Sequence, residues 1–327
     1  MAGSARRSVP DRAAIICPLA LLLALIVPLG LTTELHAQQL YKYRGENGEW
    51  IFSDRPPVDD QTPEVRELAK GSAPATVDVK HRFVGTTVEL FASNGYYAPV
   101  EIALEIVSLR GLSFPDPEQP MTWVLPPRSS RNLLQLELLE DGSTPFLEYR
   151  FRYIQGDPAA RHDPRRPYRL PYAVASQYPV TQAFPEIATH DSIDSYYAVD
   201  FAMPVGTDIF AARGGIVFDV ASSNFRAGQD IKRDGPAANV VRILHDDGTY
   251  AIYAHLNTNS IRVQPGDRVE RGDYIADSGN TGYSSGPHLH FVVMRNVGQR
   301  VESIPVTFVG ATTEPVVPAT GQLLTAY

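Results

Sequence analysis

Two histidines near the C-terminus, His288 and His290, have the residue type and spacing that metal chemistry needs. They stand two residues apart in the apolar run His-Leu-His-Phe, directly after a loop rich in Gly, Ser and Pro. In a β-strand, residues i and i+2 point to the same face. The pair would therefore project side by side from a rigid element, where one imidazole can bind a metal and the other can transfer protons.

Two upstream segments supply the other residues that such chemistry needs. The first contains His190 and, ten residues later, Asp200; the second contains His255 in the sequence Tyr-Ala-His-Leu. The only cysteine, Cys17, lies in the apolar N-terminal segment. Two histidines, one carboxylate and a water form an accepted ligand set for catalytic zinc. The sequence therefore predicts a metal site of histidine and carboxylate ligands, without thiolate.

These three segments resemble the motifs of the lysostaphin/LytM-type zinc endopeptidases, which cut peptide bonds in bacterial peptidoglycan. That family shows a His-to-Asp motif, a Tyr-x-His-Leu motif and a Gly-Pro-His-Leu-His-Phe motif, and all three occur here in that order within residues 180–300. The co-occurrence of three spaced motifs is specific. The resemblance implies a zinc metalloendopeptidase, a peptidoglycan hydrolase, with a mainly β, partly open antiparallel barrel.

The resemblance also implies a role for each of the five residues. His190, Asp200 and His290 would be the ligands of a Zn²⁺ cofactor. Zinc-bound water would be the nucleophile, with its pKa lowered toward neutrality. One of His255 and His288 would act as general base and later protonate the leaving amine, and the other would stabilise the oxyanion. The unperturbed pKa of histidine suits either role, so the sequence leaves the pair undivided.

The spacing of His190 departs from the commonest family pattern. That pattern has its first ligand four residues before the aspartate, where this chain has Tyr196. A longer-spaced branch of similar enzymes carries the histidine in a loop before Tyr-Ala-Val-Asp, and His190 fits that branch. The polar residues between His190 and Asp200 would let the loop fold back. We interpret His190 as a ligand; the alternative is a surface histidine beside a degenerate site.

The remaining histidines have simpler interpretations. His245 precedes Asp-Asp-Gly and is expected at a hairpin turn. His81 and His162 lie outside the peptidase-like segment and are expected on the surface. Tyr253 alternates with His255, which would put both side chains on one face of a strand, and packing is the expected role of Tyr253.

The pattern of strands and turns predicts a mainly β fold with several units. A C-terminal open antiparallel β-barrel or two-layer β peptidase domain at 159–310 is expected to follow a small β-sandwich-like domain at 80–155. The sandwich is expected to contain strands at 82–92, 100–108, 122–124, 132–137 and 146–153. Residues 154–168 are expected to form a linker with a solvated charge run. The tail at 311–327 is expected to be frayed.

The N-terminal region predicts a targeting signal and a small unit. Residues 1–37 combine arginines, an apolar run at 13–31 and a small residue, Ala37, after which cleavage is expected, so the protein would be periplasmic or secreted. The alternative is an uncleaved membrane anchor. Residues 38–70 predict a hairpin with an Asn-Gly turn and resemble a short domain of unknown function that often heads bacterial envelope proteins.

Composition and charge narrow the range of partners. The 327 residues are 43% hydrophobic and 20% charged, as in an ordinary globular protein. The formal net charge of -8 argues against a nucleic-acid partner. The expected substrate is a peptidoglycan peptide, and residues 38–155 could dock an envelope protein. The competing hypothesis is a catalytically inactive relative that binds and activates another cell-wall hydrolase.

Overall fold

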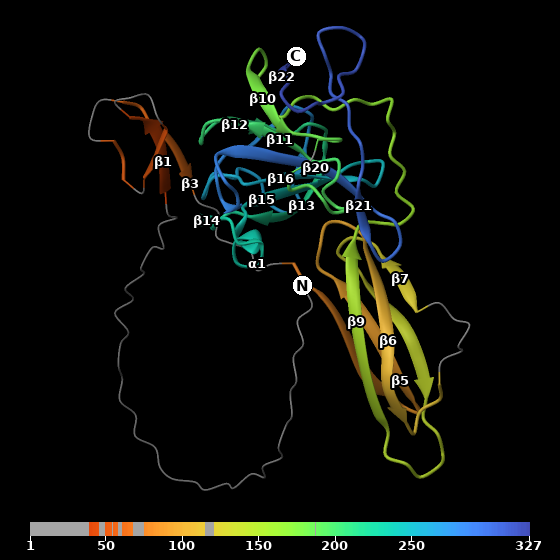
Figure 1. The fold of residues 1–327 in the computed structure, drawn as a ribbon. Coiled ribbons are helices and arrows are strands. Elements are labelled where there is room, and N and C mark those ends of the chain that lie inside the picture. Colours follow the sequence, from red (N-terminus) through yellow and green to blue (C-terminus); the bar gives the residue numbers. More distant parts are fainter. Residues whose placement is uncertain are drawn as a thin grey trace, which may run out of the picture.

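The computed structural model describes residues 39–45, 50–53, 55–57, 61–67, 75–114, 121–186 and 188–327. The predicted signal segment at 1–37 and the predicted Asn47-Gly48 turn lie outside these residues. The described chain is mainly β, as predicted, and Figure 1 shows a small N-terminal sheet, an elongated pair of sheets and a larger C-terminal domain.

The N-terminal unit is a three-stranded antiparallel sheet in the order β2-β1-β3. Its strands are β1 (Gln39–Arg44), β2 (Trp50–Ser53) and β3 (Glu64–Glu67). The sheet contacts the C-terminal domain through Lys42, which is 2% exposed. The Nζ of Lys42 donates to Asp208 Oδ1 and Asp277 Oδ1, each at 3.1 Å. This unit is therefore anchored by a buried ion pair.

The middle unit consists of two three-stranded antiparallel sheets, β4-β5-β8 and β7-β6-β9. Its strands are β4 (Val77–Val84), β5 (Thr87–Asn94), β6 (Val100–Arg110), β7 (Thr122–Leu125), β8 (Ser130–Glu137) and β9 (Phe146–Gln155). Alternate residues of β5, such as Val88 and Leu90, are buried in one cluster with Ile102 of the other sheet. The two inner faces therefore share a core, as in a β-sandwich.

The prediction of a single strand at 82–92 in the sandwich is wrong. Residues 82–92 do not form a single strand, because β4 and β5 pair antiparallel around a tight turn, with Val84 opposite Thr87. Gly85 takes a φ of +60° at this turn, a left-handed conformation that glycine adopts without a steric cost. Apolar residues lie on both sides of Gly85, so the sequence pattern indicated one continuous strand and no turn.

The C-terminal domain is built on a nine-stranded sheet in the order β17-β13-β15-β16-β20-β11-β10-β22, with β21 paired to β20. Within the described residues the edge strands β17 and β22 do not pair with each other, so the sheet is open, as predicted. Its strands are β10 (Gln177–Gln182), β11 (Val199–Ala202), β13 (Gly215–Ala221), β15 (Val240–Leu244), β16 (Tyr250–Ala254), β17 (Arg268–Val269), β20 (His288–Asn296), β21 (Val301–Ser303) and β22 (Leu323–Thr325).

Short elements complete the C-terminal domain. Two further pairs flank the sheet, namely antiparallel β12 (Asp208–Phe210) with β18 (Tyr274–Asp277) and parallel β14 (Ala227–Gly228) with β19 (Gly282–Tyr283). The helical residues are α1 (Ile231–Asp234) and the 3₁₀ turn η1 (Gly235–Ala237). Among the described residues, no helix has the length and apolar character to cross a membrane.

Strand β20 connects the core of the C-terminal domain with the sandwich. Its residues Leu289, Phe291 and Val293 are buried in the domain core. The alternate residues Val292 and Met294 belong instead to the cluster formed by the sandwich. The face of β20 that begins with His288 and His290 therefore continues beneath the sandwich, and the two units share a hydrophobic interface.

Two expectations about flexible segments are wrong. The expected linker at 154–168 packs against the C-terminal domain, where Tyr168 is 1% exposed. The expected frayed tail contains β22, which pairs antiparallel with β10, and it buries Leu324 and Ala326 in the domain core. The apolar stretch in this Pro- and Thr-rich tail is short, so the sequence pattern does not indicate a strand. The pairing depends on β10, which is distant along the chain.

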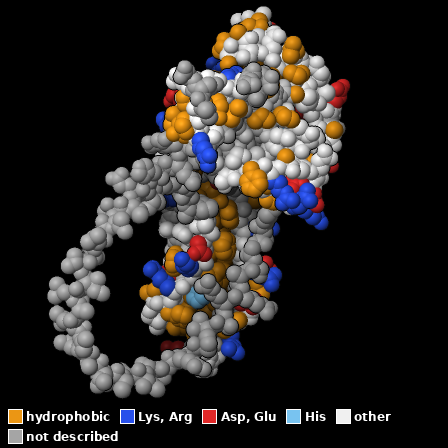
Figure 2. All heavy atoms as spheres, turned by 90° about the vertical axis from the view of Figure 1, so that its left-hand side faces the viewer, with side chains coloured by type: hydrophobic (Ala, Val, Ile, Leu, Met, Phe, Trp, Pro, Cys, Tyr) orange, Lys and Arg blue, Asp and Glu red, His pale blue; other side chains and the backbone are white. Residues whose placement is uncertain are grey.

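The surface view shows where side chains of one kind gather. On the face in Figure 2, hydrophobic side chains run in a strip along the sandwich and lie in separate patches on the larger domain. Exposed large hydrophobic residues of the sandwich include Phe83 and Phe151, and those of the C-terminal domain include Phe184 and Phe225. Scattered apolar residues of this kind are ordinary on a protein surface.

Candidate metal centre

Asp200 and His290 lie directly opposite each other on the paired strands β11 and β20. Their neighbours along these strands, Phe201 and Phe291, are fully buried in the core. Because side chains alternate between the faces of a strand, this burial directs Asp200 and His290 to the other face. The Nδ1 of His290 lies 2.9 Å from Asp200 Oδ1.

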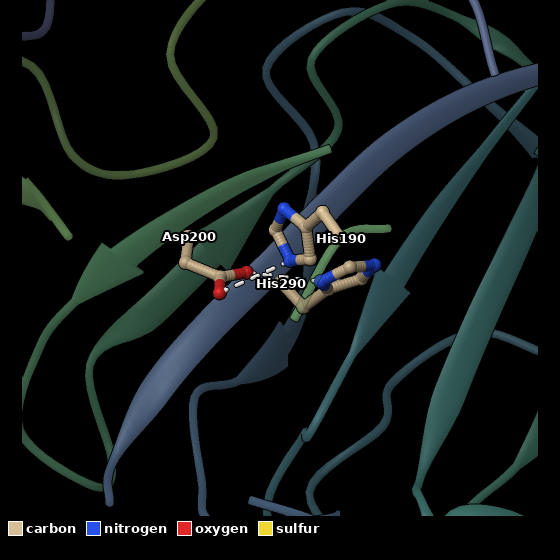
Figure 3. Close-up of side chains that lie close together, drawn as sticks. All are labelled: His190, Asp200 and His290. Atoms are coloured by element: carbon tan, nitrogen blue, oxygen red, sulfur yellow. Dashed lines mark hydrogen bonds and ion pairs between the residues drawn. The ribbon is translucent and has the colours of Figure 1, made fainter. Parts of the chain in front are cut away.

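His190 reaches the same place from the connection between β10 and β11. Its side chain points toward Asp200, as Figure 3 shows, and its Nε2 lies 3.2 Å from Asp200 Oδ2. The ring centroids of His190 and His290 are 4.9 Å apart. One donor atom from each of the three residues lies within 4.8 Å of the other two. The structure thus brings together the three side chains that the sequence nominated as ligands.

The donor set and its spacing fit a zinc ion. Two imidazole nitrogens and one carboxylate match an open catalytic zinc site with a fourth position for water. Tetrahedral ligands at ordinary zinc bond lengths stand about 3.3 Å from one another. The two rings approach different oxygens of the Asp200 carboxylate at similar distances: His290 Nδ1 lies 2.9 Å from Oδ1, and His190 Nε2 lies 3.2 Å from Oδ2.

The carboxylate of Asp200 is held in its charged form. Burial by itself raises the pKa of Asp200, because desolvation disfavours the anion. Hydrogen bonds from His190 and His290 act in the opposite direction and outweigh the burial, so the pKa of Asp200 lies well below its ordinary value. Asp200 is therefore an anion at neutral pH, as a metal ligand must be.

His255 and His288 lie beside these three residues. The ring centroids of His255 and His288 are 4.5 Å apart, and that of His255 is 5.7 Å from His290. The Nε2 of His288 lies 3.9 Å from Asp200 Oδ1. All five residues nominated by the sequence therefore belong to one cluster.

Backbone carbonyls set the tautomers of His255 and His288. The Nδ1 of His255 lies 2.7 Å from the carbonyl oxygen of Thr281, and the Nδ1 of His288 lies 2.8 Å from that of Gly286. A carbonyl only accepts, so each Nδ1 carries the proton and donates. In the neutral ring the Nε2 is then left as the basic nitrogen.

The backbone at His255 differs from the expected alternation. Strand β16 ends at Ala254, which faces His290 across the pair, and His255 takes a φ of +61°. Tyr253 is fully buried, and its hydroxyl accepts a hydrogen bond from the backbone of Ala212. Tyr253 and His255 therefore do not share a face: Tyr253 packs in the core, as expected, whereas the left-handed residue turns the imidazole of His255 to the metal side.

Burial controls the protonation of His255. Desolvation is the largest cause, followed by the nearby His290 and His288, and together they lower the pKa of His255 to about 3. His255 is therefore neutral at neutral pH, with a free lone pair on Nε2.

The other histidines lie outside this cluster. The backbone N–H of His245 donates to Thr249 and closes the hairpin between β15 and β16, which confirms the predicted turn. His81 is exposed, as expected. His162 is not a surface residue, because its side chain is 14% exposed and stacks on Tyr168.

Gln182 is a residue of this region that sequence reasoning missed. It lies on β10 opposite Asp200, is 6% exposed, and donates to Asp200 Oδ2 from its Nε2 at 3.2 Å. No motif marks a glutamine at this position. Its role is indicated only by the pairing of β10 with β11, which places Gln182 opposite Asp200 and is known only from the tertiary structure.

Comparison with known families identifies a peptidase domain that contains four residues of the cluster. Residues 194–303 match the family described as peptidase family M23, so this part of the chain is an M23 peptidase domain. The matched range includes Asp200, His255, His288 and His290, and it begins after His190.

Individual relatives agree with this assignment. Glycyl-glycine endopeptidase ALE-1 of Staphylococcus capitis is 37% identical over 103 residues, which cover 31% of this chain and 25% of that protein. Peptidoglycan DD-endopeptidase ShyA of Vibrio cholerae is 31% identical over 158 residues, which cover 46% of this chain and 32% of that protein. The chain thus spans about a quarter to a third of the length of these relatives.

One solved structure matches part of this chain. The catalytic domain of the prophage-encoded M23 protein EnpA from Enterococcus faecalis is 27% identical in sequence. The match covers 41% of this chain and 92% of that chain, with a TM-score of 0.31.

Proposed function

We propose that this protein is an exported, zinc-dependent endopeptidase that cleaves peptide bonds in peptidoglycan. The observation that carries the proposal is the convergence of His190, Asp200 and His290, with His255 and His288 beside them. The names of the two curated relatives, a glycyl-glycine endopeptidase and a peptidoglycan DD-endopeptidase, support the choice of substrate.

In this proposal His190 Nε2, the Asp200 carboxylate and His290 Nδ1 hold the ion. Zinc, when bound, supplies Lewis acidity that polarises the scissile carbonyl and lowers the pKa of water toward neutrality. The contact of His290 Nδ1 with Asp200 Oδ1 needs a proton on that nitrogen. Ligation replaces this proton, because only the neutral ring with a free lone pair binds a metal.

His255 and His288 would handle the protons. Each ring donates its Nδ1–H to a backbone carbonyl, so each offers Nε2 to the reacting groups. One Nε2 would accept the proton of the attacking water and return it to the leaving amine. The other, once protonated, would donate to the developing oxyanion. The lowered pKa of His255 means that its ring is neutral, with an unprotonated Nε2, before the reaction begins.

Access to peptidoglycan requires export. The predicted signal at 1–37 would provide it, with cleavage after Ala37 and a periplasmic or secreted product. The size of the protein made by an exporting cell would test this step. A product that begins at residue 38 supports the signal, and an intact N-terminus supports the alternative anchor.

The activity is tested by digestion of purified peptidoglycan with the mature protein. We expect new free amino groups, no new reducing sugar ends, loss of products with a chelator and recovery with zinc. His290→Ala should abolish the products, whereas His81→Ala, which removes an exposed histidine of the sandwich, should not. Equal product patterns for both variants, independent of metal, would reject the proposal.

Metal analysis separates this proposal from the inactive-relative hypothesis. A peptidase of this kind should bind one zinc ion per chain, and His290→Ala should reduce that stoichiometry. A mature protein that takes up no zinc, and that nevertheless increases digestion by a second wall hydrolase, would favour the alternative.

A further inference from the structure

Of the three candidate ligands, His190 alone lies outside a strand. Asp200 and His290 are held by the pairing of β11 with β20. The described residues of the connection, 183–186 and 188–198, are largely exposed, yet His190 among them is 4% exposed. Holding an exposed segment in one conformation costs backbone entropy at every residue. A specific contact must therefore offset that cost where the segment passes Asp200.

The side chain of Gln182 makes this contact with all of its hydrogen-bonding groups. Its Oε1 accepts from the backbone N–H of Ala188 at 2.7 Å and of Thr189 at 2.8 Å. Its Nε2 donates to Asp200 Oδ2 at 3.2 Å and to the hydroxyl of Thr189 at 3.1 Å. Two donors and two acceptor sites are the full capacity of an amide.

We propose that Gln182 is a positioning residue that fastens the His190 segment to Asp200 and thereby strengthens zinc binding at the candidate metal centre. This inference rests on the proposed function, because it concerns the same site. Gln182 bonds the two residues directly before His190 and the same Asp200 oxygen that His190 approaches. One side chain thus sets both the position of the segment and the orientation of the carboxylate.

Few other side chains could do both. A glutamate at position 182 would keep the two acceptor bonds but would place a second carboxylate against Asp200, which repels it. A methionine fills a similar volume and makes none of the four bonds. Gln182→Glu therefore removes only the hydrogen bonds that Nε2 donates, whereas Gln182→Met also removes those that Oε1 accepts.

The first measurement is zinc affinity, by competition with a chromophoric chelator. We expect Gln182→Met to weaken binding by about 10- to 100-fold, the usual effect of removing a partner that orients a metal ligand. Gln177→Met is the matched control, because Gln177 lies on the same strand, is exposed, and bonds only the Thr325 side chain among the described residues. It should stay within twofold of the unaltered protein. Equal affinities for the two variants would overturn the inference.

The second measurement, amide hydrogen exchange without zinc, does not depend on the metal. The amides of Ala188 and Thr189 should be protected in the unaltered protein and in Gln182→Glu, and they should exchange faster in Gln182→Met. Unchanged protection in Gln182→Met would also overturn the inference. If Gln182→Met fails to fold, Gln182→Ala is measured in its place with the same expectations.

The two measurements distinguish failure of this inference from failure of the proposed function. If the unaltered protein binds no zinc, the proposed function fails, and the exchange rates of Ala188 and Thr189 alone decide whether Gln182 fastens the segment. If the unaltered protein binds zinc and Gln182→Met binds it equally well, the proposed function stands and the positioning role falls.

Discussion

Glu101 should determine how firmly the sandwich is attached to the peptidase domain. It lies on β6, is 7% exposed, and its Oε2 accepts hydrogen bonds from two groups of the C-terminal domain. These donors are the side-chain nitrogen of Asn296 at 2.9 Å and the backbone N–H of Gln299 at 2.8 Å. Glu101→Ala removes this acceptor from both donors at once.

The expected loss follows from the burial of the two donors. A hydrogen bond to a charged group contributes about 1.5–3 kcal/mol to stability, and a buried donor left unpaired costs a similar amount. Asn296 is fully buried, but its side-chain nitrogen still donates to the carbonyl of Gly156. Gln299 is half-buried, so water can partly replace the lost acceptor. We therefore expect Glu101→Ala to lower the free energy of unfolding by about 2–4 kcal/mol.

Urea denaturation can measure this loss with two signals. Trp123 lies on β7, and the other tryptophan, Trp50, belongs to the N-terminal unit, so fluorescence reports on the units outside the peptidase domain. Circular dichroism reports on all the sheets. We expect the fluorescence transition of Glu101→Ala to shift to lower urea and to separate from the circular dichroism transition.

Glu105 provides the matched control for this prediction. It lies on the same strand and is exposed, so Glu105→Ala should change stability by less than about 0.5 kcal/mol. If Glu101→Ala is no less stable than Glu105→Ala, and its two transitions coincide, the inferred role of the Glu101 contact is wrong.

Three further predictions concern the metal centre, pH and the N-terminal unit. Asp200→Asn should weaken zinc binding by at least about 100-fold in a chelator competition, because a neutral amide is a poor zinc ligand; affinity like that of the unaltered protein would argue against ligation. Burial lowers the pKa of His245 to about 4, so the unfolded chain binds the proton first as pH falls below 6.5 and the folded state loses stability. That loss is ~2 kcal/mol between pH 7.5 and pH 5. The urea midpoint of His245→Gln should therefore depend less on pH over this range than that of the unaltered protein. An equal pH dependence of the two midpoints would contradict the burial argument. Lys42→Met removes an ammonium from between Asp208 and Asp277, which should cost about 3 kcal/mol, near the low end for a buried pair because Asp208 is half exposed. The loss of this contact should speed proteolysis of the N-terminal unit relative to Lys80→Met. Equal cleavage rates for the two lysine variants would refute the anchoring role of Lys42.

Three spaced motifs, through their resemblance to a known family, were enough to nominate the side chains that meet at the candidate metal centre. Asp200 and His290 stand in short apolar strands, where alternation with buried neighbours decides which side each residue takes. The Asp-Asp-Gly sequence after His245 was likewise sufficient to place a hairpin. Such features depend on neighbours within a few positions of the chain, so they are visible in the sequence.

Local pattern failed where backbone conformation or a distant contact decides the outcome. Alternation predicts that Tyr253 and His255 share one face of a strand, but the left-handed backbone at His255 directs the two side chains to different sides. A tail rich in Pro and Thr gives little sign that Leu324 will be buried, because its partner strand β10 lies about 140 residues earlier.

The amino-acid sequence by itself determined the β class of this protein, the motifs that nominated the five clustered residues, and the strand that carries His288 and His290. Only the tertiary structure decided how His190 reaches them, because its position depends on Gln182, which faces Asp200 through strand register. It also decided that the sandwich packs on the histidine-bearing face of β20. Both outcomes come from contacts between segments that are distant along the chain, and their energies appear only when the segments are brought together.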